Sequence, residues 1–352
     1  MTLRASLFRF DMLDFTCDYN NGAHPSVLQR LIDTNGLISG TYGFDEFSES
    51  AADKIRAAVE DPGAAVYFIA GGTQTNMTVI SSCLKSYEGV VCADTGHINC
   101  HESGAVEYTG HKIIRLPSHA GKVDAGELED LLSSFYADQS HEHMVYPGML
   151  YISYPTEYGT IYSKTELQAL RGVCVKYGMK LFCDGARLGY GLCSDGADIT
   201  LPELHGLCDV MYIGGTKCGA LCGEAVVFQR GAVPDHFVTL IKQRGAMLAK
   251  GRLIGVQFDA LFEDGLYFRI ANQAIRRANE LRALLDAKGY SQFVGSPSNQ
   301  IFVVLDDETV KRLSENVKFE IWEKPDKDRT VMRFVTSWST TPEQIAELGR
   351  LL

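Results

Sequence analysis

One lysine of this chain stands where a charged residue is costly. Lys217 lies in "DVMYIGGTKCGALCGEAVVF" (residues 209–228), between two apolar, strand-like runs. Removing an ammonium group from water costs several kcal/mol, so lysine is among the residue types least often buried. A lysine that follows a strand can form an imine with a carbonyl compound when desolvation and its neighbours lower its pKa. Lys217 is therefore a candidate nucleophile.

Two further motifs suit a phosphorylated pyridine. Asp184 directly follows the apolar run of "LFCDGARLGYG" (181–191), where an acid can hold a cationic ring nitrogen or cap a helix. Gly72 and Thr73 in "AGGTQTNMTVI" (70–80) lie at a strand-to-helix turn, where free backbone N–H groups suit a phosphate, although many such turns are only turns. Lysine, acid and phosphate cradle are the three groups that hold pyridoxal phosphate. Their combination is much more specific than any one motif.

Other polar residues near these motifs have more than one interpretation. Arg187 can pair with Asp184 or bind a substrate carboxylate. The stretch "DTGHINCHESGAVE" (94–107) gathers four possible metal ligands: His97, Cys100, His101 and Glu102. It lacks a Cys-x-x-Cys or His-Glu-x-x-His element, so we expect no metal, and a histidine stacked on a flat cofactor fits as well. His141 and His143 lie in a polar loop and are expected to face solvent.

The apolar runs between residues 60 and 230 predict the framework that positions these groups. Continuous hydrophobic runs such as "AAVYFIAGG", "GMLYISYP" and "KLFCDGA" alternate with helix-length amphipathic segments. This pattern is typical of an α/β fold, a mostly parallel sheet with helices on both faces. From residue 256 the pattern is helical up to Gly289, and then "NQIFVVL", "TVMRFVTSW" and a capped helix in "TPEQIAELGRLL" follow. We expect an N-terminal arm (1–20), a large cofactor-binding domain (21–254) and a smaller α+β C-terminal domain (255–352).

Composition excludes several functional classes. The 352 residues are 45% hydrophobic and 22% charged, as in an ordinary globular protein. The net charge of −11 argues against a nucleic-acid or acidic-membrane surface and favours a small-molecule substrate. No apolar run is long enough for a membrane span, and no G-x-G-x-x-G follows a first strand. Ten scattered cysteines and the absence of a secretory signal predict a cytoplasmic enzyme with reduced thiols.

Nine blocks make the chain similar to a known family, the low-specificity L-threonine aldolases. They extend from about residue 15 to the C-terminus and read "SGTYGFD", "GGTQTN", "GHINCHESGA", "YISYPTEYGTIYS", "FCDGARLGYGL", "GGTKCGALCGEAVVF", "IKQRGAMLAKG", "SNQIFVVL" and "MRFVTSW". That family belongs to the β-eliminating lyase group and has the aspartate-aminotransferase-like fold of pyridoxal phosphate enzymes (fold type I). The resemblance implies this fold and this cofactor here.

The resemblance also implies how the cofactor would be held. Lys217 would form the imine, and Asp184 would bond the pyridinium nitrogen. His97 would stack on the cofactor ring, while Gly72 and Thr73 would hold its phosphate.

Substrate binding and assembly are implied in the same way. Arg187 and Arg333 would bind the substrate carboxylate. Tyr42, in "GTYGFD", lies where the family brings a loop into the active site of a neighbouring subunit, so the resemblance implies a homotetramer built as a dimer of dimers. Either Arg244 or Lys250 would supply the cation that reaches a neighbour's phosphate.

Three positions depart from the family pattern. Thr216 precedes Lys217 where many members have serine, and its hydroxyl could contact the phosphate. Cys17 stands where members often carry a serine near the substrate carboxylate. Glu157 stands where one branch has a histidine, so the group that accepts the β-hydroxyl proton is either Glu157 or His97 acting through a water.

The reaction implied is retro-aldol cleavage. L-Threonine or L-allo-threonine would yield glycine and an aldehyde by breaking the Cα–Cβ bond. A relative on the same scaffold that performs racemisation, β-elimination or phenylserine cleavage is the alternative, and a ligand-binding relative without turnover is another. Aldehyde release from L-threonine, set against racemisation of alanine, separates these possibilities.

Overall fold

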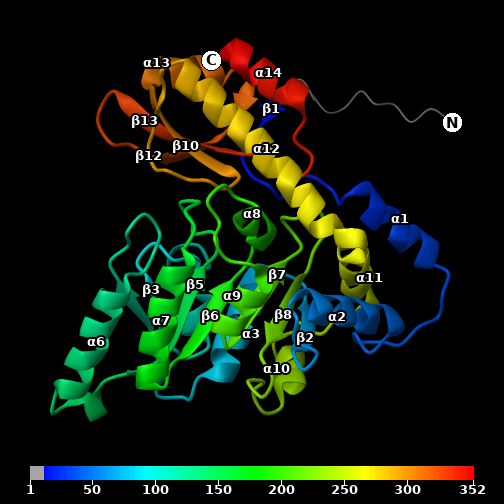
Figure 1. Ribbon diagram of the computed structural model, residues 1–352, viewed down its shortest axis with the longest axis vertical. Helices are drawn as coiled ribbons and strands as arrows, with labels where there is room; N and C mark the ends of the chain where they lie inside the picture. Colours follow the sequence, from blue (N-terminus) through cyan, green and yellow to red (C-terminus); the bar gives the residue numbers. More distant parts are fainter. Residues whose placement is uncertain (1–11) are drawn as a thin grey trace.

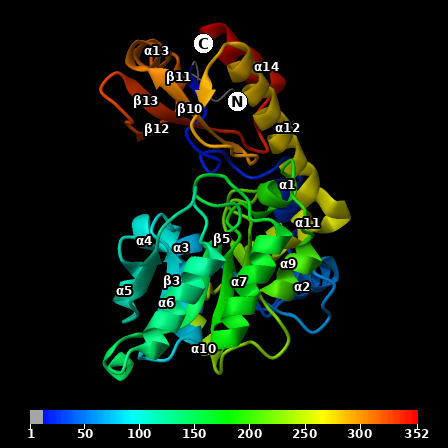
Figure 2. The ribbon, with the colours of Figure 1, turned by 60° about the vertical axis from the view of Figure 1, so that its left-hand side comes forward.

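Two lobes joined by a long helix make up the chain (Figure 1). The computed structural model describes residues 12–352; the first part of the predicted arm, residues 1–11, lies outside the described residues. The larger lobe surrounds a seven-stranded sheet and the smaller a four-stranded sheet. The view turned by 60° shows the smaller lobe above one end of the larger sheet (Figure 2). Within residues 12–352, no helix is long and apolar enough to cross a lipid bilayer.

The seven-stranded sheet confirms the predicted mostly parallel α/β fold. Its strands are β2 (Ala65–Ile69), β3 (Glu88–Ala93), β4 (Ile113–Leu116), β5 (Tyr146–Ser153), β6 (Lys180–Asp184), β7 (Val210–Gly214) and β8 (Glu224–Phe228). The order is β2-β8-β7-β6-β5-β3-β4, and β8 alone runs antiparallel to both of its neighbours. The pairs from β7 through β4 are parallel.

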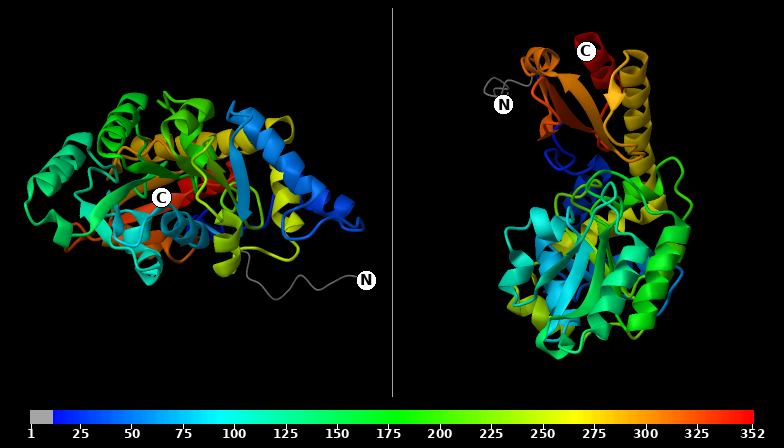
Figure 3. Two further views of the ribbon diagram at one scale, coloured as in Figure 1. Left: turned by 90° about the horizontal axis from the view of Figure 1, so that it is seen from below. Right: turned by 90° about the vertical axis from the view of Figure 1, so that its left-hand side faces the viewer.

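Helices cover both faces of this sheet, as the view from below shows (Figure 3). Alternate residues of β5 therefore enter two different cores: Leu150 and Ile152 pack in one, Met149 and Tyr151 in the other. The helical segments are α1 (Pro25–Thr34), α2 (Glu46–Ala58), α3 (Gly72–Cys83), α4 (His97–Cys100), α5 (Ala105–Tyr108), α6 (Ala125–Ala137), η1 (His141–His143), α7 (Lys164–Tyr177), α8 (Leu188–Leu192), α9 (Leu201–Leu207), α10 (Phe237–Gln243) and α11 (Arg252–Leu261). Burial on both faces explains why the strands read as continuous apolar runs.

The smaller lobe has its own core. Its elements are η2 (Glu263–Gly265), α12 (Leu266–Ala287), β9 (Ser291–Gln292), β10 (Gln300–Asp306), α13 (Asp307–Leu313), β11 (Val317–Lys318), β12 (Glu320–Glu323), β13 (Arg329–Val335) and α14 (Pro342–Leu351). The sheet order is β12-β13-β10-β9, and the two strands expected from the sequence are its centre. The polar segment between them is not a plain loop, because it forms α13, β11 and β12.

Local signals fix the ends of several elements. Helix α12 stops before Gly289, whose φ of +79° favours glycine. Helix α14 begins at a capping box, in which the Thr341 hydroxyl accepts the N–H of Gln344 and the Gln344 side chain accepts the N–H of Thr341. Strand β1 (Leu13–Asp14) pairs with β11, so the arm is tied to the smaller lobe.

Candidate active site

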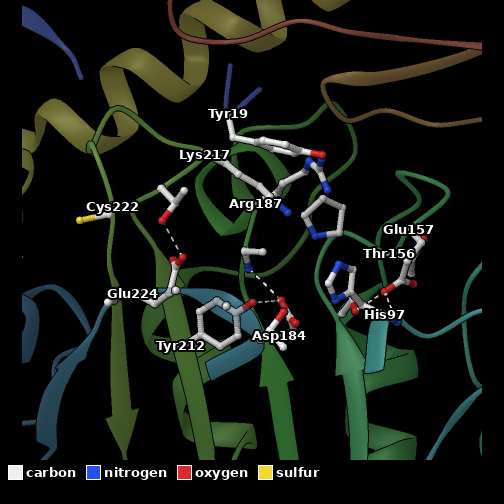
Figure 4. A pocket seen from close by; sticks show the side chains of 18 residues that line it. Tyr19, His97, Thr156, Glu157, Asp184, Arg187, Tyr212, Lys217, Cys222 and Glu224 are labelled. Carbon is white, nitrogen blue, oxygen red and sulfur yellow. Dashed lines mark hydrogen bonds between the residues drawn. The ribbon is translucent and has the colours of Figure 1, made fainter. Parts of the chain in front are cut away.

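A cavity opens where the two lobes meet, at the carboxyl ends of parallel strands. It has a volume of about 300 Å³, and a second cavity of about 210 Å³ adjoins it and shares five of its lining residues: Tyr19, His97, Glu157, Arg187 and Lys217. The first cavity also brings together predicted site residues from five separate segments: Gly72, Thr73, His97, Glu157, Asp184, Arg187, Thr216 and Lys217. Arg333 lines the second. Figure 4 shows the side chains of the first cavity, among them His97, Asp184 and Lys217, beyond the ends of the strands.

Asp184, the last residue of β6, is buried at the cavity floor. Its Oδ2 accepts hydrogen bonds from the Tyr151 hydroxyl at 2.5 Å and from Nδ2 of Asn76 at 3.0 Å. Its Oδ1 accepts from the Tyr212 hydroxyl at 2.5 Å and from the N–H of Ala186 at 2.9 Å. Burial acts to raise the pKa of this carboxyl, but the nearby His97 ring and these donors hold it below its usual value. The group therefore stays anionic.

Lys217 enters the cavity from the loop between β7 and β8. Burial lowers the pKa of its ammonium and the Arg187 cation lowers it further, while Asp18 and other acids act in the opposite direction. Its Nζ lies 5.6 Å from the centre of the Tyr19 ring. The Tyr190 hydroxyl donates to the Lys217 carbonyl at 2.6 Å and fixes the backbone. A lysine in this setting is a better nucleophile than one in water.

Glu224, at the start of β8, is a buried acid that the sequence had not singled out. Its Oε1 accepts the hydroxyl proton of Thr216 at 2.7 Å, and its Oε2 accepts the N–H of Gly215 at 3.0 Å. Burial raises the pKa of Glu224 to about 8, although the Thr216 hydrogen bond and the nearby Lys217 act to lower it. The Thr216 hydroxyl also accepts the N–H of Gly223 at 3.0 Å, and of the acceptors near it Glu224 is the closer, the Gly223 carbonyl lying 3.5 Å away. The acid in the apolar run "CGEAVVF" was the available signal.

The predicted phosphate cradle is the start of helix α3. Gly71 precedes the helix in an extended conformation and no side chain caps it, so the first N–H groups lack an intrahelical partner. A Cβ at Gly71 would meet nothing within 4 Å, and one at Gly72 would only touch the Tyr212 hydroxyl at 3.4 Å. Backbone N–H groups and the helix dipole there suit an anion.

Arg187 is held by an acid that the sequence also failed to mark. Its Nε and Nη2 donate to the two oxygens of buried Asp18 at 2.8 and 3.0 Å. Asn299 of the smaller lobe donates to the same carboxylate at 2.9 Å. The pair leaves Nη1 of Arg187 for a ligand, so Arg187 faces the cavity in a fixed orientation.

Arg333, on β13, lines the second cavity. Its Nη1 donates to the Gln300 side chain at 2.9 Å, and its Nη2 is paired with Glu320. The guanidinium carbon lies 5.1 Å from the centre of the Trp322 ring. Its Nε is buried and has no partner among the described residues. Arg333 therefore keeps one unpaired donor and lines the same cavity as Arg187.

Residues 94–107 hold four possible metal ligands, and two of these pair with each other. Nδ1 of His97 lies 2.7 Å from Oε1 of Glu102. Within residues 12–352, no group of three or more His, Cys, Asp or Glu side chains is arranged to hold a metal ion. Glu157 accepts the N–H of His97 at 2.9 Å and the hydroxyl of Ser153 at 2.6 Å, both on Oε1. Burial raises the pKa of Glu157, and the Ser153 hydrogen bond opposes that rise.

Four predicted or considered residues lie away from this cavity. Cys17 does not line either cavity, and Tyr42 lies in a different depression, with Nζ of Lys242 4.3 Å from the centre of its ring. The Arg244 carbonyl accepts from the side chain of Gln74 on α3 at 3.2 Å, while Lys250 lines a groove beside α1.

The match to a family model decides the family. The β-eliminating lyase model matches residues 39–317, most of the chain. The chain belongs to the β-eliminating lyase family. It is 38% identical to a threonine aldolase of Leishmania major over 96% of this chain and 98% of that one, with a TM-score of 0.93. It is also 27% identical to a low-specificity L-threonine aldolase of Pseudomonas aeruginosa over 96% of both chains.

A more distant likeness concerns the fold alone. An aspartate aminotransferase of Thermus thermophilus is 14% identical, covers 97% of this chain and 92% of its own, and has a TM-score of 0.68. The predicted aspartate-aminotransferase-like fold is confirmed. This chain is a lyase that depends on pyridoxal phosphate, and both predictions are confirmed.

The residues present fit that cofactor. A lysine with a lowered pKa, an anionic carboxylate and uncapped N–H groups of a helix line one cavity. The open space around Gly71 leaves room for the backbone to approach a phosphate closely. The buried Nε of Arg333, without a partner among the described residues, adds a donor for an anionic substrate.

Proposed function

We propose that this protein cleaves β-hydroxy-α-amino acids, L-threonine and L-allo-threonine among them, to glycine and an aldehyde. The reaction is a retro-aldol cleavage of the Cα–Cβ bond. The observation that carries the proposal is the convergence of Lys217, Asp184 and Arg187 on one cavity, with Arg333 in the adjoining one. The printed names of the relatives in Leishmania major and Pseudomonas aeruginosa support the same reaction.

Pyridoxal phosphate, when bound, supplies an electron sink for the electron pair of the broken bond. Lys217 would hold it covalently through Nζ, and Asp184 would keep its ring nitrogen protonated. The N–H groups around Gly72 and Thr73 would hold the phosphate. The Thr216 hydroxyl, the other predicted phosphate contact, donates to Glu224 in this structure.

Two arginines hold the substrate carboxylate. Arg187 offers Nη1, because Asp18 occupies its other edge, and Arg333 offers the guanidinium that lines the adjoining cavity. Binding at two fixed donors limits rotation of the amino acid and orients the bond that breaks. This arrangement also excludes water from the carboxylate, since both guanidinium groups are largely buried.

The β-hydroxyl proton has two candidate acceptors. Glu157 directs Oε1 toward the N–H of His97 and the Ser153 hydroxyl, which leaves Oε2 for the substrate. Burial raises its pKa toward the range in which a carboxylate is an effective general base. His97 acting through a water is the other candidate, with its Nδ1 already bound to Glu102.

The proposed reaction is tested by product analysis. The holoenzyme is incubated separately with L-threonine, L-allo-threonine and L-alanine, and acetaldehyde, glycine and D-alanine are measured. The proposal expects equal amounts of acetaldehyde and glycine from the threonine isomers. Alanine racemisation or ammonia release without acetaldehyde would favour the racemase or β-elimination alternative.

The assembly is proposed to be a homotetramer, a dimer of dimers. Support comes from large apolar side chains exposed on α1 and the loop after it: Leu28, Ile32, Leu37, Ile38 and Phe44. Ile38 is 100% exposed and Ile32 67%, which is costly unless a second copy covers them. Tyr42 on the same loop would reach a neighbour's site, and Arg244 or Lys250 its phosphate. Light scattering coupled to size-exclusion chromatography measures the mass of the assembly. The mass of a monomer would contradict the proposal.

A cytoplasmic location and three-part organisation are also proposed. All ten cysteines are free, which suits a reducing compartment. We propose the division into an arm (1–20), a large domain (21–254) and a small domain (255–352), and the separate apolar core of the smaller lobe supports two domains. Phe15 of the arm joins that core, whereas α11 and the first half of α12 pack in the core of the larger lobe.

A further inference from the structure

A buried hydrogen-bond network joins two of the residues proposed to contact the cofactor. Oε1 of Glu102 lies 2.7 Å from Nδ1 of His97 and 2.7 Å from Nδ2 of Asn76. The same Asn76 nitrogen donates to Oδ2 of Asp184 at 3.0 Å. Figure 4 shows His97 and Asp184 at the wall of the cavity that this network backs.

The orientation of the Asn76 amide is determined by its partners. Asn76, on α3, is buried, and both hydrogens of its amide nitrogen point to carboxylate oxygens. The flipped amide would place an oxygen against those carboxylates and lose both bonds. Asn76 therefore couples the position of Glu102 to that of Asp184.

Glu102 has no charged partner other than His97 among the described residues. Its side chain is 0% exposed, and its Oε2 has no hydrogen-bond partner there. A buried carboxylate is costly unless it is paired and hydrogen-bonded. The His97 ring, 34% exposed toward the cavity, is the group that meets this need. Moving the His97 ring away would leave the buried Glu102 carboxylate unpaired, and this free-energy cost restrains the ring.

We propose that Glu102 is a positioning residue: it keeps the proton of His97 on Nδ1, directs Nε2 toward the cavity and holds the ring against the bound cofactor. Asn76 ties this pair to Asp184, so the two contacts to the cofactor are set together. The proposal rests on the cofactor site given above. Glu102 thus acts on His97 and not as a metal ligand.

The test is a double-mutant cycle in cofactor affinity. Glu102→Gln keeps the shape and removes the charge, and His97→Phe keeps a flat ring without nitrogen atoms. Apoenzyme is titrated with pyridoxal phosphate for wild type, both single variants and the double variant. We expect Glu102→Gln to weaken binding about tenfold in the wild-type background and not at all in the His97→Phe background.

Kinetics and a control separate positioning from general damage. Glu102→Gln should lower kcat while leaving KM for L-threonine within about twofold, because the arginines that hold the carboxylate are untouched. Exposed Glu107 lies on the neighbouring helix α5, and Glu107→Gln should match wild type in every measurement. If Glu102→Gln does not fold, Glu102→Asp repeats the cycle with the carboxylate withdrawn by one methylene.

Two results would overturn the proposal. One is unchanged cofactor affinity and kcat in a folded Glu102→Gln protein, and the other is additive losses in the double variant. The measurements of cofactor affinity do not depend on which amino acid is cleaved. A wild-type protein that binds cofactor and shows the non-additive cycle but releases no aldehyde would refute the proposed reaction and leave this inference standing.

Discussion

Replacing Asp18 by asparagine should weaken both the fold and substrate binding. The Asp18 carboxylate is fully buried and accepts from Nε and Nη2 of Arg187 and from Nδ2 of Asn299. It thereby joins the arm, the larger lobe and the smaller lobe at one point. Asp18→Asn removes the charge and replaces one carboxylate oxygen by an amide nitrogen. That nitrogen cannot accept a hydrogen bond from the donors around it.

The expected magnitude follows from that geometry. Removing one partner of a buried ion pair costs about 3–5 kcal/mol, because the other charge stays buried. Arg187 Nε and Asn299 Nδ2 both donate to Oδ2, so the oxygen that remains in Asp18→Asn can keep two of the three hydrogen bonds while the charge is lost. We therefore expect a loss of about 2–3 kcal/mol in the free energy of unfolding. The matched control is Asp53→Asn, since exposed Asp53 pairs with Arg56 at 2.6 Å and such pairs contribute at most about 1 kcal/mol.

The loss should depend on pH with a defined sign. Burial acts to raise the pKa of Asp18, but Arg187, Lys217 and the Asn299 hydrogen bond hold it below its usual value. A carboxyl with a lowered pKa stabilises the fold above its unfolded pKa of about 4 and loses this effect as pH falls through the folded value. The difference between wild type and Asp18→Asn should therefore be constant from pH 7 down to about 4 and shrink below.

Urea unfolding of the apoenzyme measures these free energies, and steady-state kinetics give KM. We expect KM for L-threonine to rise by about tenfold or more in Asp18→Asn, since Arg187 loses its fixed orientation. The reasoning is refuted if the folded variant loses less than about 0.5 kcal/mol, or no more than Asp53→Asn.

Three further substitutions probe the floor of the cavity and the substrate clamp. Asp184→Asn turns an amide toward tyrosine hydroxyl donors and cannot keep a ring nitrogen protonated, so acetaldehyde release should fall by about 100-fold or more. Gly185→Ala places a Cβ 2.0 Å from the Tyr212 carbonyl oxygen and should destabilise by about 1–3 kcal/mol in thermal unfolding, whereas Gly172→Ala, in open space on α7, should stabilise slightly. Arg333→Gln should raise KM without changing the affinity for pyridoxal phosphate, and equal losses in both would contradict its assignment.

The fold was largely predictable because burial on both faces leaves a direct trace in the sequence. Strands β5, β6 and β7 are continuous apolar runs, and parallel central strands need such runs. The direction of β8 was not predictable, since "EAVVF" reads the same in either orientation. The weak polar strands β11 and β12 were missed, because they are two and four residues long and one lies at a sheet edge.

Site residues were predictable where they lie at the end of a strand. They were not predictable where they act through another residue. Asp184 ends the apolar strand β6, and Arg187 and Lys217 each come three residues after the end of an apolar strand, so the sequence marks all three. Asp18 was not predictable, because 169 positions separate it from Arg187 and nothing local marks it. The sequence marks Glu102 only as a possible metal ligand, since its partner Asn76 lies 26 residues away on helix α3.

The central claim is that Lys217 is the residue through which this lyase holds its cofactor. Holoenzyme is reduced with borohydride and digested, and the peptides are analysed by mass spectrometry. The account predicts one reduced pyridoxal phosphate group per chain, on Lys217. A group on a different lysine, or an unmodified Lys217 peptide from a protein that contains the cofactor, would contradict it.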